Sequence, residues 1–175
     1  MKLIARAWFV AILCCLSFSR CGVYGFTGAS ISPDIKTISI QTFFNNALLG
    51  PSNMSVLFTE RIKDYFQQNT SLALVDENGD LQLDGYIADY KITPVAANAS
   101  GASDGADVSS LSRITISVFA TYVNTQDGSW DFERRFSFFV DYDQALDLSA
   151  NEQGFVEEIF DQIVIDIFNA SVANW

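Results

Sequence analysis

Two alternating segments joined by a short turn constrain the fold of this chain more than any other feature. Residues 113–122 alternate apolar and polar side chains, and residues 129–142 do so again after the turn Gln126-Asp127-Gly128. A period of two residues is that of a β-strand, and two strands joined by a tight turn form an antiparallel hairpin. This turn brings Arg113 near Asp141, so the pattern predicts a long hairpin with a surface ion pair.

Three further segments also favour strands. Residues 35–44 alternate and predict one strand with Phe44 on its apolar side, and residues 72–75 predict a short edge strand. Residues 81–93 predict a long strand in which Gly85 marks a bulge. The segment 94–112 is rich in small residues and predicts a mobile loop, which either reaches a partner or is a tolerated insertion.

Two segments have a helical period. Apolar residues recur every three or four positions from Met54 to Phe66, and again from Phe155 to Phe168 behind an expected capping box of Ser149 and Glu152. A helix between the first two strands predicts that they are parallel. The fold class expected is an α/β two-layer sandwich, with a mixed and mostly antiparallel sheet and two helices on one face.

The charge balance excludes several classes of function. All 21 acidic residues follow residue 20, where only seven bases remain, so nucleic acid is not an expected partner. The chain has no histidine, and no cofactor or metal site is expected. The acidic turn 76–80 lacks the spaced ligands of a calcium loop.

An enzyme is the least favoured class. Asp141 with Asp143, or Asp76 with Asp80, offers a pair of carboxylates, but such pairs arise by chance among 21 acids and neither has a pocket signature. The expectation is a protein without catalytic activity.

The N-terminal residues have the features of a lipoprotein leader. Lys2 and Arg6 precede an apolar run of twelve residues, 7–18, which suits export and is too short to span a bilayer. Cys21 follows the run, and it is the expected lipid attachment site; an ordinary signal peptide with a leftover cysteine is the alternative. We expect a signal peptide at 1–20, a tether at 21–34 and one α/β domain at 35–175.

Several of these stretches together resemble the LptE family of lipopolysaccharide-assembly lipoproteins. They are the segment from Cys21 to Ser30, the strand ending near Asn45-Asn46, the strand opening at Gly79-Asp80-Leu81-Gln82, and a terminal helix ending in Phe168-Asn169 before Asn174-Trp175. The resemblance implies a two-helix, mixed-sheet domain lodged inside the outer-membrane barrel LptD. It also implies a role in assembling that barrel and in receiving lipopolysaccharide for insertion into the outer membrane, with the protein lipid-anchored and facing the periplasm.

The charge pattern predicts where lipopolysaccharide would touch the domain. Phosphates favour Arg and Lys, and four bases fall on the expected strands: Lys91, Arg113, Arg134 and Arg135. The terminal helix carries carboxylates on its polar face, so the sheet is the expected contact. The alternative is that these bases form ordinary surface ion pairs.

A second function class shares the same features. A generic lipid-anchored periplasmic scaffold or transport-auxiliary protein, without a role toward lipopolysaccharide, would have the same leader, acidic domain and lack of catalytic groups. Co-purification with a large outer-membrane barrel separates the two hypotheses.

Overall fold

The structure is a computed structural model that describes residues 31–95, 111–128 and 130–172. The expected signal peptide, Cys21, most of the tether and the central part of the segment 94–112 lie outside the described residues.

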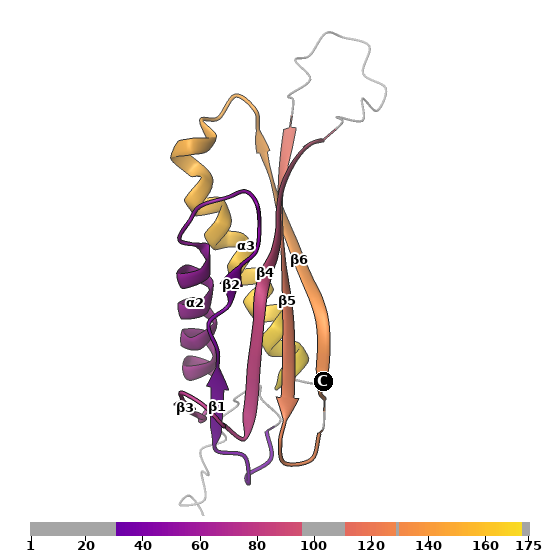
Figure 1. Cartoon of the computed structure of the whole chain (residues 1–175). Coiled ribbons are helices and arrows are strands. Elements are labelled where there is room, and N and C mark those ends of the chain that lie inside the picture. Colours follow the sequence, from indigo (N-terminus) through magenta and orange to yellow (C-terminus); the bar gives the residue numbers. More distant parts are fainter. Residues whose placement is uncertain (1–30, 96–110, 129, 173–175) are drawn as a thin grey trace, which may run out of the picture.

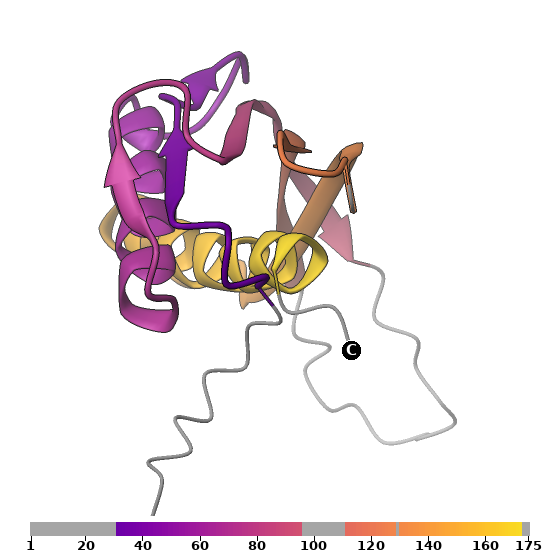
Figure 2. The same ribbon diagram turned by 90° about the horizontal axis from the view of Figure 1, so that it is seen from below.

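The described chain forms a mixed sheet with two helices beside it, which confirms the expected fold class (Figure 1). The elements are β1 (Thr37–Ile40), β2 (Phe44–Asn45), α2 (Met54–Asn69), β3 (Ala73–Val75), β4 (Leu81–Val95), β5 (Leu111–Asn124), β6 (Phe132–Asp143) and α3 (Leu148–Ser171). The strand order is β3-β1-β4-β5-β6, and β2 pairs with β4 beside this path. Seen from below, the strands curve in an arc on one side of α3 (Figure 2).

The strand directions follow the expected connections. β1 runs parallel to β3 and to β4, while β4, β5 and β6 are antiparallel. In the hairpin of β5 and β6, Arg113 lies opposite Asp141, as the turn predicts. The helical crossover through α2 and the tight turn at 126–128 therefore account for the mixed sheet.

The core lies between the sheet and the helices. Phe58 of α2 meets Phe160 of α3 edge to face at 4.9 Å and Phe43 at 5.0 Å, and all three rings are fully buried. The apolar stripe of α3 faces this core, as the helical period predicts. Burial of these rings, together with the aliphatic side chains of the core, stabilises the two-layer packing.

The first strand differs from the expectation of one continuous segment. β1 ends at Ile40 and β2 begins at Phe44, so Phe43 is buried and Phe44 is 67% exposed. The break is fixed by α2: the Phe43 amide donates to Thr59 Oγ1 (3.0 Å), and Ser55 Oγ donates to the Phe43 carbonyl (2.7 Å). Strand alternation fails here because helix side chains satisfy the backbone in place of a neighbouring strand.

The expected bulge at Gly85 is also wrong. The register of β4 shifts between Ile87 and Asp89 instead, whereas Gly85 stays in register opposite Ala120. A Cβ on Gly85 would lie 2.1 Å from the Phe119 carbonyl oxygen and 2.6 Å from Phe43 Cε1. Gly85 is thus required for close packing, not for a bulge.

The expected capping box at the start of α3 is wrong as well. Asp147 is the N-cap, and its carboxylate accepts hydrogen bonds from the Ser149 amide (3.0 Å) and hydroxyl (2.7 Å). Glu152 instead accepts a hydrogen bond from the Tyr90 hydroxyl at 2.7 Å. The helix begins one residue before Ser149, so Glu152 is free to join α3 to β4.

Candidate functional site

The face of β4, β5 and β6 opposite the helices is the candidate functional surface, called the open face below. The apolar even-numbered residues of β5 are buried toward the core, so the odd-numbered residues of β5 and β6 lie on the open face. On β4 this face carries Gln82, Asp84 and Tyr86 before the register shift and Asp89, Lys91 and Thr93 after it. Three of the four predicted bases reach this surface.

Arg113 is held by two neighbours on the open face. Its Nε and Nη2 donate to the two carboxylate oxygens of Asp141 at 2.7 and 2.8 Å, and its guanidinium lies 3.6 Å from the ring centroid of Phe139. The hydrogen bond raises the pKa of Arg113 and lowers that of Asp141. The expected ion pair is confirmed, and two of the five N–H donors of Arg113 are engaged by Asp141.

Lys91 also has an acidic neighbour. Its ammonium forms an ion pair with Asp89, two residues earlier on β4. Lys91 lies opposite Thr115, two positions along β5 from Arg113, so the two bases are diagonal neighbours. Lys91 and Arg113 are therefore each paired with a carboxylate of their own, from Asp89 and Asp141 respectively.

Arg134 and Arg135 point to opposite faces of the sheet. Arg134, opposite Ala120, lies on the helix side of β6, with its guanidinium 4.7 Å from the Phe136 centroid and 5.2 Å from the Phe132 centroid. Arg135 lies opposite Phe119 on the open face, and no described residue forms an ion pair, hydrogen bond or ring contact with its side chain. The structure therefore does not gather the four bases into one cluster.

The spacing along β5 measures this separation. Phe119, which lies opposite Arg135, is six residues along β5 from Arg113. Six residues of a strand span about 20 Å. A single phosphate cannot bridge Arg113 and Arg135. An extended ligand with several anionic groups could contact both.

A row of aromatic side chains crosses the open face at the level of Arg135. Phe44 of β2 lies opposite Tyr86, Tyr86 lies opposite Phe119, and Phe119 lies opposite Arg135. The rings of Tyr86 and Phe119 stack at 5.4 Å. This row could not be predicted from the sequence because it depends on the break before β2 and on the register between four strands.

Arg134 and Arg135 also border a shallow hollow at the edge of the sheet. The hollow has a volume of about 470 Å³ and lies between β6 and α3, with Phe136, Asp166, Asn169 and Ala170 as its other lining residues. Asp166 places a carboxylate in the same space. The hollow is therefore of mixed charge.

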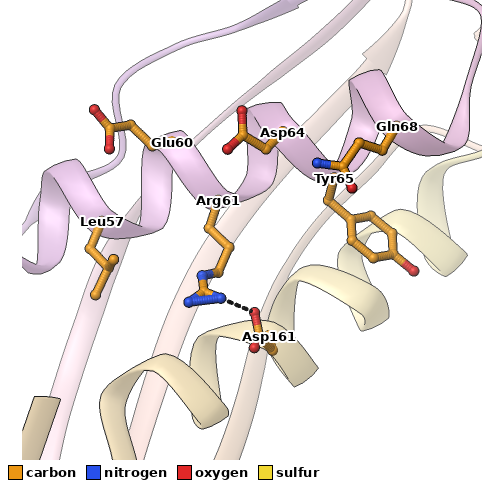
Figure 3. Close-up of a pocket in the computed structure, with 7 residues that line it drawn as sticks. All are labelled: Leu57, Glu60, Arg61, Asp64, Tyr65, Gln68 and Asp161. Atoms are coloured by element: carbon orange, nitrogen blue, oxygen red, sulfur yellow. Dashed lines mark hydrogen bonds and ion pairs between the residues drawn. The ribbon is translucent and has the colours of Figure 1, made fainter. Parts of the chain in front are cut away.

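A second groove lies between the two helices (Figure 3). It has a volume of about 390 Å³ and is lined by Leu57, Glu60, Arg61, Asp64, Tyr65, Gln68 and Asp161. Arg61 donates to Asp161 Oδ1 at 2.7 Å and to Glu157 Oε2 at 3.3 Å, so the only base of the groove already bridges α2 and α3. This groove repels anionic ligands because its remaining charges are acidic.

The bridge made by Arg61 engages two of the carboxylates on the polar face of α3. The pKa of Glu157 is lowered by hydrogen bonds from Gln153 and then from Arg61. The one indication of this bridge in the sequence is that Arg61 lies next to Ile62, beside the apolar stripe of α2. The partner could not be read from the sequence because it is 96 to 100 residues away.

The carboxylates of the described residues do not form a metal site. Among residues 31–95, 111–128 and 130–172, no group of three or more metal-ligating side chains comes together. Asp80 of the acidic turn accepts hydrogen bonds from the Lys36 amide, from the amide and hydroxyl of Thr37, and from Gln126. Its carboxylate therefore ties the turn to β1 and to the β5–β6 turn, as a structural residue does.

The predicted lipid attachment site, Cys21, lies outside the described residues. No helix in the described part of the chain is long and apolar enough to cross a membrane.

Comparison with known proteins gives one family and a set of similar folds. The family model LptE, described as lipopolysaccharide-assembly, matches residues 35–171. No curated protein matches the chain. A hypothetical protein from Chlamydia trachomatis is 13% identical with a TM-score of 0.51, and the alignment covers 78% of this chain and 97% of that one.

Two lipoproteins are also similar in structure. Rare lipoprotein B from Shewanella oneidensis is 13% identical with a TM-score of 0.47, covering 77% of this chain and 92% of that one. A minor lipoprotein from Acinetobacter baumannii has the same identity and TM-score, covering 77% of this chain and 90% of that one.

Proposed function

Because this chain belongs to the LptE family of lipopolysaccharide-assembly proteins, we propose that it is a lipid-anchored outer-membrane lipoprotein. In this proposal it associates with a barrel of the LptD type and assists the insertion of lipopolysaccharide into the outer membrane. Cys21 carries the lipid, and the domain faces the periplasm. The observation that carries the proposal is the family match, which spans every described element from β1 to α3.

The domain is suited to binding rather than to catalysis. The family acts in assembly, and the carboxylates of the described residues are engaged in structural bonds at Asp80, Asp141, Asp147 and Glu157. The proposed contribution of the protein is therefore a surface that a barrel or a lipid can contact.

For lipopolysaccharide, the proposal favours the open face over the helices. Arg135 is exposed, and all five of its N–H donors are available to a phosphate. Arg61, the base between the helices, is already bonded to two carboxylates. The aromatic row beside Arg135 adds apolar area for the rest of such a ligand. Arg113 and Lys91 contribute as secondary contacts because each must share its charge with an acid.

Affinity purification tests the proposed partnership. The tagged chain is isolated from detergent-solubilised envelopes, and the bound proteins are identified by mass spectrometry, with an unrelated tagged lipoprotein as the control. The expected result is enrichment of one large outer-membrane barrel together with lipopolysaccharide. Enrichment of periplasmic proteins without a barrel would favour the generic scaffold instead.

A further inference from the structure

Trp130 lies at the tip of the β5–β6 hairpin in a conformation that its own packing does not explain. Its φ of +66° falls in the left-handed region, which is rare for a bulky residue. Its side chain is 63% exposed and lies outside the core. A strained backbone that presents a large exposed aromatic ring is typical of a contact site.

The position of Trp130 identifies the surroundings of that ring. A small hollow of about 100 Å³ is lined by both Trp130 and Ile31, together with Ile35, Tyr122 and Val172. Trp130 therefore lies near Ile31, where the described chain begins. The β5–β6 turn is at the lower end of the sheet (Figure 1). This is the end of the domain from which the segment leading to Cys21 departs.

The length of that segment limits how far the membrane can lie from Trp130. Cys21 and Ile31 are ten positions apart in the sequence, and a fully extended chain of this length spans at most about 36 Å. If Cys21 carries acyl chains, the bilayer surface is within this reach of Ile31, which shares the hollow with Trp130.

We infer that Trp130 contacts the interface of the phospholipid bilayer in which the anchor is inserted, and so holds the sheet end-on to the membrane. This inference rests on the proposed lipid attachment at Cys21. Tryptophan suits the role because its ring prefers the headgroup region, where one edge is apolar and the other is hydrated. Ile31, which is half-buried, lines the hollow beside the ring and adds apolar surface there.

The charges around the turn define the kind of lipid. Asp131 accepts a hydrogen bond from the Asn124 amide at 2.7 Å, and Asp127 also lines the hollow. These carboxylates repel anionic headgroups, so the contact is with zwitterionic phospholipid. Added anionic lipid should weaken it, and added salt should restore part of the loss.

The loop that carries Leu48 is also apolar and exposed, but it lies far from Trp130, so it serves as the comparison site for membrane contact. Leu48 is 99% exposed, and the loop that carries it is fixed by Gly50, which packs against Met54 and Tyr90. Tyr90 is nine residues along β4 from Leu81, about 30 Å from the lower end of the sheet. A membrane that meets Trp130 end-on does not meet Leu48.

Tryptophan fluorescence tests the inference with the full lipoprotein in phosphatidylcholine vesicles. In a Trp175→Phe background, Trp130 is the only tryptophan after residue 20. The expected result is emission shifted to shorter wavelength, with loss of most of the signal when the acyl chains are brominated. The matched variant carries Leu48→Trp with Trp130→Phe and Trp175→Phe, and its emission should be unaffected by bromination.

Three outcomes would overturn the inference. One is a protein that floats with the vesicles while Trp130 is not quenched, which leaves the anchor intact and removes the contact. Another is quenching at position 48 in place of 130, which places the membrane against the apolar loop. The third is a protein that does not float with the vesicles, which contradicts the lipid anchor itself.

Discussion

The ring of Phe43 lies against Gly85, so close that a Cβ on Gly85 would come within 2.6 Å of Phe43 Cε1. The same Cβ would meet the Phe119 carbonyl oxygen of the neighbouring strand at 2.1 Å. Because Phe43 is fully buried and its backbone is bonded to α2, neither neighbour can move aside without disturbing the core.

Gly85→Ala is therefore expected to destabilise the domain. Overpacking of a core costs about 1 to 3 kcal/mol, and the contact with a backbone carbonyl places this site at the upper end. Urea unfolding measures the change. Gly154→Ala is the matched control, because a Cβ at Gly154 meets nothing within 4 Å and alanine is the better helix former by about 1 kcal/mol. Equal effects at the two sites would contradict the packing role of Gly85.

Phe160→Ala tests whether the apolar stripe of α3 is core. Phe160 is fully buried against Phe58, so its truncation is expected to cost about 3 to 5 kcal/mol and to lower the melting temperature. Phe44→Ala, at an exposed ring, is expected to change stability by less than about 0.5 kcal/mol. A stable Phe160→Ala protein that fails to bind a barrel would show that the stripe is an interface.

Asp80 should make stability depend on pH in the acidic range. Hydrogen bonds from the Lys36 amide and from Thr37 hold the pKa of Asp80 below its ordinary value. A carboxyl group whose pKa is lowered by folding stabilises the folded state above its unfolded pKa of about 3.9, and this contribution is lost as the pH falls through the lower folded value. The midpoint of urea unfolding should therefore fall on acidification from about pH 5 to pH 3.

The variant Asp80→Asn should flatten part of that acid dependence and lower stability at neutral pH. Asp84→Asn is the control, since no described residue bonds to the Asp84 side chain. Identical pH profiles for the Asp80 variant and the unaltered protein would assign the acid sensitivity to other carboxylates.

Charge reversal distinguishes the bases of the open face. Arg135→Glu is expected to reduce lipopolysaccharide binding more than Arg113→Glu, because Arg113 is already paired with Asp141. Each lost charge-assisted contact corresponds to about 1.5 to 3 kcal/mol, or roughly ten- to hundredfold in affinity. Binding is measured by calorimetry without divalent ions.

The corresponding control neutralises the acidic face of α3 at Glu157, Glu158 and Asp161. These changes should leave binding the same or improve it, because repulsion is removed. Loss of binding only in this second set would move the ligand from the sheet to the helices.

Cys21→Ala tests the anchor directly. Without the thiol no acyl chain can attach, so the protein should move from the membrane pellet to the soluble periplasmic fraction. Mass spectrometry of the unaltered protein should show acylation at residue 21. Unchanged membrane fractionation of the Cys21→Ala protein would rule out this attachment site.

The parts of the fold that the sequence predicted are those controlled by local periodicity. The helix starting at Met54 follows from its apolar spacing, and the pairing of Arg113 with Asp141 follows from a turn centred on Asp127. A turn fixes the register of both its strands, so one local signal determines contacts 28 residues apart.

The remaining features depend on tertiary packing. The inward rotation of Phe43 requires Thr59 and Ser55 of α2. A glycine within a strand looks the same in the sequence whether it forms a bulge or, as Gly85 does, leaves room for the ring of Phe43. The bridge from Arg61 to Asp161 depends on how the helices pack, and the aromatic row depends on registers between strands. Periodicity within one segment contains none of this information.

The position of β1 between β3 and β4 has a consequence for how the chain acquires its structure. Ile38 and Ile40 pair with Leu81 and Leu83, so the strand that comes first in the sequence waits for partners more than 40 residues later. In a chain synthesised from its N-terminus, one edge of this apolar segment stays unpaired until β3 has followed it, and the other until β4 has followed. Loop closure over that distance must precede the pairing with β4, so this segment is open to aggregation until β4 is available.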